Sequence, residues 1–397
     1  MDFRQPINET PGPVALNVAI AHRGRAFIAG TEDGFKIFQA SDARQVHAYE
    51  IDPPMGVGIA EMVEDSQYVG LCGGGKNALL PRNKYILWNM ADKAAIHTMF
   101  YPASIEGLRI NKKFIMVTFR DQVKLYKFPS KTREPPQKLA EYETERNPYG
   151  LCCLGSKVVV VLGRNAGQVR VTDLPHATNT RFFPVHNSSI RALTLSTDET
   201  LFATASEKGT LIRVWSTKDG AKIGEYRRGM DPATIYSIAI SPSCLHMAVT
   251  SDKSTLHVFA LPKRVEAMRA ERAKAADTYA VEGKAKWGVL AELPLMPRIF
   301  TDQYSTASAP FDPGEEREYW QRGDLHAKPG QGTTAPIPGL PDGRPPKGVI
   351  GWLTDHETFV VNAGRVSYWE HFLVSQNQDG TTTLTNAGYK NYMTQDF

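Results

Sequence analysis

Two adjacent arginines, Arg227 and Arg228, have the most informative chemistry in this chain. Successive side chains on an extended strand point to opposite faces, so each arginine of such a pair can serve a separate pocket. Guanidinium groups, hydroxyls and backbone amides are the donors that hold phosphate. Short hydroxyl residues stand on both sides of the pair, namely Thr204, Ser206, Thr210, Ser251, Ser254 and Thr255. The pattern predicts two anion-binding pockets and not a centre that breaks bonds. The competing interpretation is two solvated strand residues that bridge nearby acids, an arrangement worth little energy.

The sequence around the arginines resembles a known family. Residues 203–213 read ATASEKGTLIR, and Tyr226-Arg227-Arg228-Gly229 follows about a dozen residues later. This combination resembles the PROPPIN family, the WIPI-like seven-bladed β-propellers that bind phosphatidylinositol 3-phosphate and phosphatidylinositol 3,5-bisphosphate. The resemblance covers most of residues 14–311, including residues 71–77, 81–88 and 251–259. The SEKGTLIR stretch and the Pro-Arg-Asn-Lys loop resemble the branch that contains the yeast homologous-with-swollen-vacuole proteins.

The resemblance implies two phosphoinositide sites and their residues. The first site consists of His186, Thr204, Ser206, Lys208, Gly209, Thr210, Arg213 and Arg227. The second site consists of Arg228, Gly229, Ser251, Ser254, Thr255 and His257. Tyr226 departs from the Phe or Leu that is commonest at this position of the motif, which we interpret as a packing variation. The two histidines could instead satisfy structural hydrogen bonds; if they face phosphate, the dianion favours the imidazolium and strengthens binding at mildly acidic pH.

Residues 263–302 interrupt the β pattern with an excess of basic residues and a run of large apolar ones. The apolar side chains are Trp287, Leu290, Leu293, Leu295, Met296, Ile299 and Phe300. Apolar residues beside basic ones suit shallow insertion at the headgroup level of an anionic membrane. The family resemblance implies the same, since its members carry a membrane-inserting loop in blade six. The alternative is that this segment packs back onto blade six. A second interruption, residues 312–346, is rich in Pro, Gly and charge and is predicted to be a disordered loop.

The glycine-rich stretch Gly70–Asn77 comes close to a phosphate-binding P-loop but departs from it. Asn77 stands where a magnesium-binding hydroxyl belongs, and Pro81 comes too early for the following helix. The glycines suit a turn from a strand into a rim loop. In the resembling family this loop contributes to recruiting a lipid-transfer protein, which assigns Pro81 and Arg82 to partner binding.

Composition describes an ordinary protein with a sizeable core: 397 residues, 42% hydrophobic and 22% charged, with a formal net charge of +4. The four cysteines have neither metal-ligand nor disulfide spacing, so we expect reduced thiols and no metal or other cofactor. No apolar run approaches the ~20 residues of a membrane span, and the polar start does not resemble a signal peptide. No catalytic motif appears, so an enzyme is not expected.

Short apolar or alternating runs recur every 8–12 residues and group at a period of about 40, the length of one propeller blade. The sequence therefore predicts an all-β, seven-bladed WD40-type β-propeller that forms a single domain over residues 1–397. We place its blades at residues 14–52, 57–102, 104–145, 148–184, 189–228, 234–311 and 348–374. The last blade lacks a local fourth strand, and we expect the N-terminal chain to supply it.

These observations predict a peripheral membrane protein of autophagy, monomeric in solution. It would be cytoplasmic and would associate with pre-autophagosomal, endosomal or vacuolar membranes. The alternative is a propeller that serves only as a scaffold for protein interactions, because fold alone does not fix function. Nucleic acid is not an expected partner, since the basic residues do not follow one continuous groove.

Overall fold

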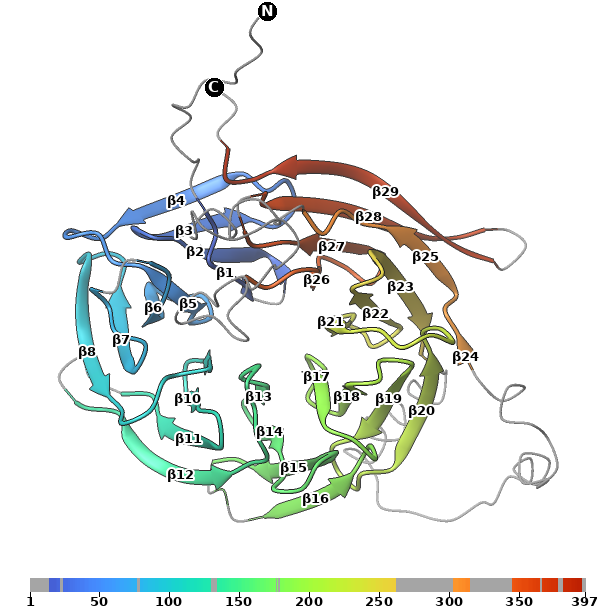
Figure 1. The fold of residues 1–397 in the computed structure, drawn as a ribbon, viewed down its shortest axis with the longest axis horizontal. Helices are drawn as coiled ribbons and strands as arrows, with labels where there is room; N and C mark the ends of the chain where they lie inside the picture. The colour runs from blue at the N-terminus through green and yellow to red at the C-terminus, as the bar shows by residue number, and fades with distance from the viewer. Residues whose placement is uncertain are drawn as a thin grey trace, which may run out of the picture.

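The computed structural model describes residues 14–21, 24–76, 79–129, 134–175, 177, 179–261, 303–314, 345–364, 366–377 and 381–394. In these ranges the regular elements are β-strands, grouped into seven sheets that are antiparallel except where β24 joins one of them. Figure 1 shows the sheets arranged as the blades of a ring around a central axis. The predicted all-β, seven-bladed propeller is confirmed.

The first four blades follow one another in sequence order. Blade one contains β1 (Asn17–Ala21), β2 (Ala26–Gly30), β3 (Gly34–Gln39) and β4 (Gln45–Glu50). Blade two contains β5 (Val57–Met62), β6 (Tyr68–Gly73), β7 (Lys84–Asn89) and β8 (Ala94–Phe100). Blade three contains β9 (Gly107–Ile110), β10 (Phe114–Thr118), β11 (Gln122–Lys127) and β12 (Gln137–Glu143). Blade four contains β13 (Cys152–Leu154), β14 (Val158–Leu162), β15 (Gln168–Asp173) and β16 (Thr180–Pro184).

The last three blades carry the predicted phosphate residues and the ring closure. Blade five contains β17 (Ile190–Leu195), β18 (Leu201–Ser206), β19 (Leu211–Ser216) and β20 (Lys222–Arg227). Blade six contains β21 (Ile235–Ile240), β22 (His246–Ser251), β23 (Thr255–Ala260) and β25 (Ala307–Pro310). Blade seven contains β26 (Val349–Trp352), β27 (Glu357–Val361), β28 (Tyr368–Gln376) and β29 (Thr382–Asn391).

The core lies between the blades. The middle strands are buried on both faces, and all five residues of β14 are buried, as expected for a continuous apolar run. Each pair of neighbouring blades shares one cluster of buried side chains. Between blades five and six, for example, the rings of Tyr226 and Phe259 meet edge to face with centroids 5.5 Å apart. This packing fixes the angle between neighbouring blades and hence the sites at their junctions.

The prediction that the N-terminal chain completes blade seven is wrong. The fourth strand of that blade is β29, which pairs with β28 along its whole length and lies beyond the predicted end of the blade at residue 374. The ring closes through side chains instead, since Phe27 of blade one packs against Phe359 of blade seven. The N-terminal segment contributes a single bridge, Ala15 to Gly364. The hairpin formed by β28 and β29 therefore supplies the outer strand of blade seven, and the N-terminal segment does not form it.

The interruption in blade six ends at the outer edge of blade five. A two-residue strand, β24 (Gln303–Tyr304), pairs in parallel with Tyr226 and Arg227 of β20. The chain then crosses to blade six, where β25 forms the outer strand beside β23. Figure 1 shows β24 at the perimeter between β20 and β25. The chain that follows residue 302 therefore joins the two blades that carry the predicted pockets.

Candidate functional site

A tight turn between β18 and β19 sets the geometry of the site. Gly209 has a positive φ of 61°, and a Cβ at this position would lie 1.7 Å from the backbone oxygen of Ala233. Only glycine allows both this conformation and this close approach to blade six. The Gly209 amide donates to the Ser206 carbonyl at 2.9 Å, while Lys208 is exposed at the tip of the turn.

Arg213, on β19, faces blade four. Its guanidinium donates to the backbone oxygen of Val185 at 2.6 Å and lies 3.4 Å from Nδ1 of His186. The other ring nitrogen of His186 is 2.9 Å from Oγ1 of Thr204, which also accepts a hydrogen bond from Trp215 at 3.2 Å. Thr204 is fully buried. The Thr204 hydroxyl therefore orients the imidazole of His186 from its buried side and is not exposed to a ligand.

Arg227 shares this face of blade five. Arg213 is paired with Glu225 at 2.7 Å, and the two residues are directly opposite in the ladder. Because side chains alternate along β20, Arg227 points to the same face as Glu225, and Tyr226 points to the core between blades five and six. Burial opposes ionisation of Glu225, but the hydrogen bond and charge of Arg213 lower its pKa. The first predicted site is thus a half-buried cationic cluster that already contains one carboxylate.

Arg228 turns the other way, towards blade six. Its Nε donates to the Gly209 carbonyl at 3.1 Å, and a terminal nitrogen donates to the Asp231 carbonyl. Its own amide donates to the Thr210 carbonyl at 3.0 Å. The predicted divergence of the two arginines therefore agrees with the backbone. Arg228 is only 9% exposed, because the turn and the chain after β20 cover it.

The residues from blade six gather around the turn between β22 and β23. Ser251 is fully buried, and its hydroxyl accepts from the Lys253 amide at 3.4 Å. Ser254 has a positive φ of 54°, and Thr255 donates its hydroxyl hydrogen to the Lys253 carbonyl at 3.1 Å. The hydroxyls of Ser251 and Thr255 therefore support this turn. Gly229 differs from Gly209, because a Cβ there would meet open space.

The two histidines lie in matching electrostatic environments. Burial and then the charge of Arg213 lower the pKa of His186 to about 4. Burial and then the charge of Arg228 lower the pKa of His257 to about 4. Each histidine is therefore neutral near pH 7 without ligand, and each lies within the field of the arginine assigned to the same site. The negative charge of a bound phosphate would raise the pKa of both histidines, because it favours the charged imidazolium.

One contact in the second site was not predicted from the sequence. Ser305 lies between β24 and β25, and its hydroxyl is 3.2 Å from Nδ1 of His257. The two residues are 48 positions apart, and residues 262–302 between them lie outside the described ranges. No local pattern could have paired them, because the contact depends on where the chain returns to blade six.

The predicted partner loop lies between β6 and β7. Pro81 is exposed and Arg82 is half-buried, with the Arg82 carbonyl accepting from the Ile105 amide of blade three at 3.0 Å. A Cβ at Gly73 would lie 1.8 Å from the Leu80 carbonyl, so the glycine permits the tight loop that was predicted. Blade two is separated from blades five and six by two blades on each side of the ring. The loop and the arginine pair thus occupy opposite sectors of the propeller.

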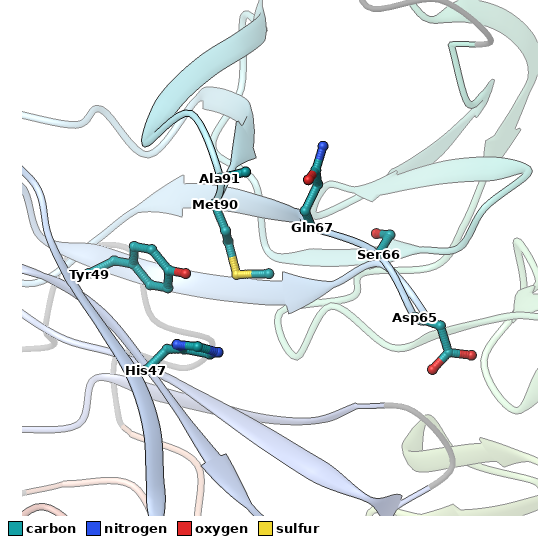
Figure 2. A pocket seen from close by; sticks show the side chains of 7 residues that line it. All are labelled: His47, Tyr49, Asp65, Ser66, Gln67, Met90 and Ala91. Carbon is teal, nitrogen blue, oxygen red and sulfur yellow. The ribbon is translucent and has the colours of Figure 1, made fainter.

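A shallow pocket of about 600 Å³ lies between blades one and two. Figure 2 shows His47 and Tyr49 from β4 on one side of it and Met90 with Ala91 on the other. None of the predicted phosphate-site residues lines this pocket. The predicted phosphate-site residues lie elsewhere, on and beside the turns of blades five and six.

The predicted membrane-contacting residues, Trp287 to Phe300, lie outside the described ranges, as do residues 315–344. Where the structure describes the chain, it contains no helix that is long and apolar enough to cross a membrane. All four cysteines are free thiols, as predicted. Among the described residues, no group of three or more potential ligands is arranged to hold a metal ion.

Comparison with known proteins agrees with this fold. A curated relative, SVP1-like protein 2 of Emericella nidulans, is 42% identical over 332 residues, which cover 84% of this chain and 99% of the relative. Autophagy-related protein 18e of Arabidopsis thaliana is 32% identical and covers 65% of this chain and 69% of its own. The solved structure of Kluyveromyces lactis Hsv2 superposes with a TM-score of 0.72 at 19% identity, covering 96% of this chain and 99% of that one. The family model named PROPPIN matches residues 18–295, and the chain belongs to the PROPPIN family.

Proposed function

We propose that this protein binds phosphatidylinositol 3-phosphate and phosphatidylinositol 3,5-bisphosphate through two pockets that flank Arg227 and Arg228. It acts as an effector of autophagy that recruits a lipid-transfer protein to the membrane. The role is one of binding and not of catalysis. The protein works from the cytoplasmic side of pre-autophagosomal, endosomal or vacuolar membranes.

The observation that carries this proposal is the divergence of the two arginines. Arg227 lies on the face of blade five that holds Arg213, beside His186 from the chain that follows blade four, whereas Arg228 reaches the Gly209 carbonyl beside blade six. Each arginine thus belongs to a separate cluster of cationic and hydroxyl groups. A membrane that presents many phosphoinositide headgroups can occupy both clusters at once, and two linked weak contacts give strong retention.

The return of the chain at β24 supports a membrane-facing role for this edge. The apolar and basic segment before residue 303 must end at the perimeter where Tyr304 pairs with Arg227. Insertion of that segment and capture of headgroups would then occur on the same edge of the ring. We propose that residues 263–302 insert at the headgroup level, with electrostatic attraction from their basic side chains.

The position of Pro81 and Arg82 supports a second, separate role. Blade two lies across the ring from the arginine pair, so its rim loop faces away from a membrane bound at blades five and six. A protein partner could therefore bind there without competing with lipid. We propose that this loop contacts the lipid-transfer protein.

Liposome flotation tests the lipid proposal and its rival together. The intact protein is mixed with vesicles that contain phosphatidylinositol 3-phosphate, phosphatidylinositol 3,5-bisphosphate, phosphatidylinositol 4-phosphate or phosphatidylserine at matched surface charge. We expect flotation with the two 3-phosphorylated lipids and little with the others. Equal flotation on all charged vesicles would show that binding depends on surface charge alone and not on the 3-phosphate. No flotation on any vesicle would favour the alternative, a propeller that serves only as a scaffold for protein interactions.

A further inference from the structure

A second arginine cluster lies between blades three and four, away from the predicted lipid sites. Arg170, on β15, is 91% buried, since only 9% of its surface is exposed. Its guanidinium lies 5.2 Å from the ring centroid of Tyr142 on β12 and 4.7 Å from that of Phe182 on β16. The cation is therefore held between two aromatic rings from neighbouring blades.

The two aromatic rings contact the guanidinium of Arg170 but provide no hydrogen-bond acceptor for its N–H groups. Cation–π contacts use the flat faces of the group, but its N–H donors point outwards in the plane. The Nε of Arg170 is buried and has no hydrogen-bond partner, and its terminal nitrogens form no hydrogen bond or ion pair within the described chain. The terminal nitrogens are not among the fully buried unpaired atoms, so an incoming acceptor could reach them and pair with the charged group. Burial, followed by the charge of Arg164, lowers the pKa of Arg170, and the charge of Glu143 acts in the opposite direction without cancelling the shift.

We propose that Arg170 is the anchor of an anion-binding site at the junction of blades three and four, and that its ligand is a carboxylate side chain of an acidic protein segment. The carboxylate would accept hydrogen bonds from the terminal nitrogens while Tyr142 and Phe182 hold the guanidinium plane. This site is independent of the proposed lipid pockets, because none of its residues belongs to them.

Charge favours a single carboxylate over a phosphate dianion. The nearest second cation, Arg164, is already paired with Glu143 at 2.7 Å. The side chains of Arg170, Arg164 and Glu143 together carry one net positive charge, and Glu143 would repel a dianion more strongly than a single carboxylate. The predicted lipid sites differ, since Arg213 and Arg227 share one face of blade five and Arg228 adds a further charge at its other side.

The surroundings favour a protein segment over a free small acid. β16 is the outer strand of blade four, paired on one side with β15 alone among the described strands. Phe182 on this strand keeps 46% of its surface exposed despite its contact with Arg170. An extended segment along this edge could place a carboxylate at Arg170 and an apolar side chain against the exposed face of Phe182.

Arginine side-chain NMR of the full chain tests the site directly. The Nε–H signal of Arg170 is identified by its loss in Arg170→Lys, with Arg170→Gln as a second variant should the first not fold. Sodium acetate should shift this signal saturably, with an apparent Kd on the order of 1–10 mM, whereas sodium chloride at matched ionic strength should not. The Nε–H of Arg44, an exposed arginine beside Asp42, is the control that should respond equally to both salts.

Two further titrations separate the ligand sources. Inorganic phosphate should bind at least threefold more weakly than acetate, and N-acetyl-Glu-Phe-amide should bind more tightly than acetate because its ring can cover Phe182. Absence of a saturable acetate shift would overturn the site, tighter binding of phosphate would overturn the carboxylate assignment, and a peptide no tighter than acetate would overturn the protein segment. Arg170→Lys should still float on phosphatidylinositol 3-phosphate vesicles, so this test does not depend on the proposed lipid function.

Discussion

The guanidinium of Arg228 donates a hydrogen bond from Nε to the backbone carbonyl of Gly209 at 3.1 Å, and this contact ties the arginine pair to the turn between β18 and β19. The arginine therefore has a structural role even without ligand. Arg227 is half-buried on the opposite face of the strand, whereas Arg228 is only 9% exposed. The two halves of the motif should differ in how much each stabilises the fold.

Replacing Arg228 by Thr should lower both stability and lipid binding. The carbonyls of Gly209 and Asp231 would lose a charged donor, and we expect a loss of about 1–3 kcal/mol in the free energy of unfolding. Arg227→Thr should weaken lipid binding with a smaller loss of stability. Urea unfolding followed by tryptophan fluorescence measures the difference. Equal losses of stability would contradict the distinct environments of the two side chains.

The ligand-free protein should lose stability as the pH falls below neutrality. The pKa of His186 is about 4 in the folded protein and about 6.5 in the unfolded chain. Because the folded pKa is the lower one, the contribution of neutral His186 is complete above pH 6.5 and declines as the pH falls towards 4. His186→Gln should therefore reduce the loss of stability between pH 7 and pH 5 by about 2 kcal/mol. If the free energy of unfolding depends on pH in the same way in the variant and the wild type, His186 does not contribute to the loss of stability at low pH.

Changing Pro81 and Arg82 to Ala should separate partner recruitment from lipid binding. The two residues lie across the ring from the arginine pair, so flotation on phosphatidylinositol 3-phosphate vesicles should stay at the wild-type level. Binding of the lipid-transfer partner in a pull-down should fall. Lys93→Ala, an exposed change elsewhere on blade two, is the matched control. Retained partner binding, or a parallel loss of flotation, would contradict this assignment.

Replacing Trp287, Leu290, Leu295 and Phe300 by Ser should lower membrane retention without affecting the headgroup sites. Full burial of one large apolar side chain is worth roughly 1.5–3 kcal/mol, so even partial insertion of several should change affinity tenfold or more. Flotation measures retention, and calorimetry with a short-chain phosphoinositide measures the pockets. Flotation equal to wild type would contradict insertion, and loss of headgroup binding would indicate that the segment packs on blade six.

The sequence predicted the elements that have local signals. The apolar run of β14 and the alternation in β19 identified strands, but the close approach of Gly209 to blade six was not predicted. The closure of blade seven was mispredicted because β29 is rich in Thr and Asn and has little apolar pattern. The burial of Arg228 and the contact between Ser305 and His257 depend on how distant parts of the chain pack together. A short stretch of sequence carries no information about such packing.

Flotation of the double variant Arg227→Thr/Arg228→Thr on phosphatidylinositol 3-phosphate vesicles tests the central claim most directly. Circular dichroism first establishes that the variant keeps its β structure, and Arg44→Thr/Lys93→Thr controls for the loss of two positive charges on blades one and two. We predict that the arginine-pair variant stays at the bottom of the gradient while the control floats like wild type. Either single variant should float partially, because the remaining pocket still binds. A folded double variant that floats as well as wild type would contradict the assignment of the lipid sites to this pair.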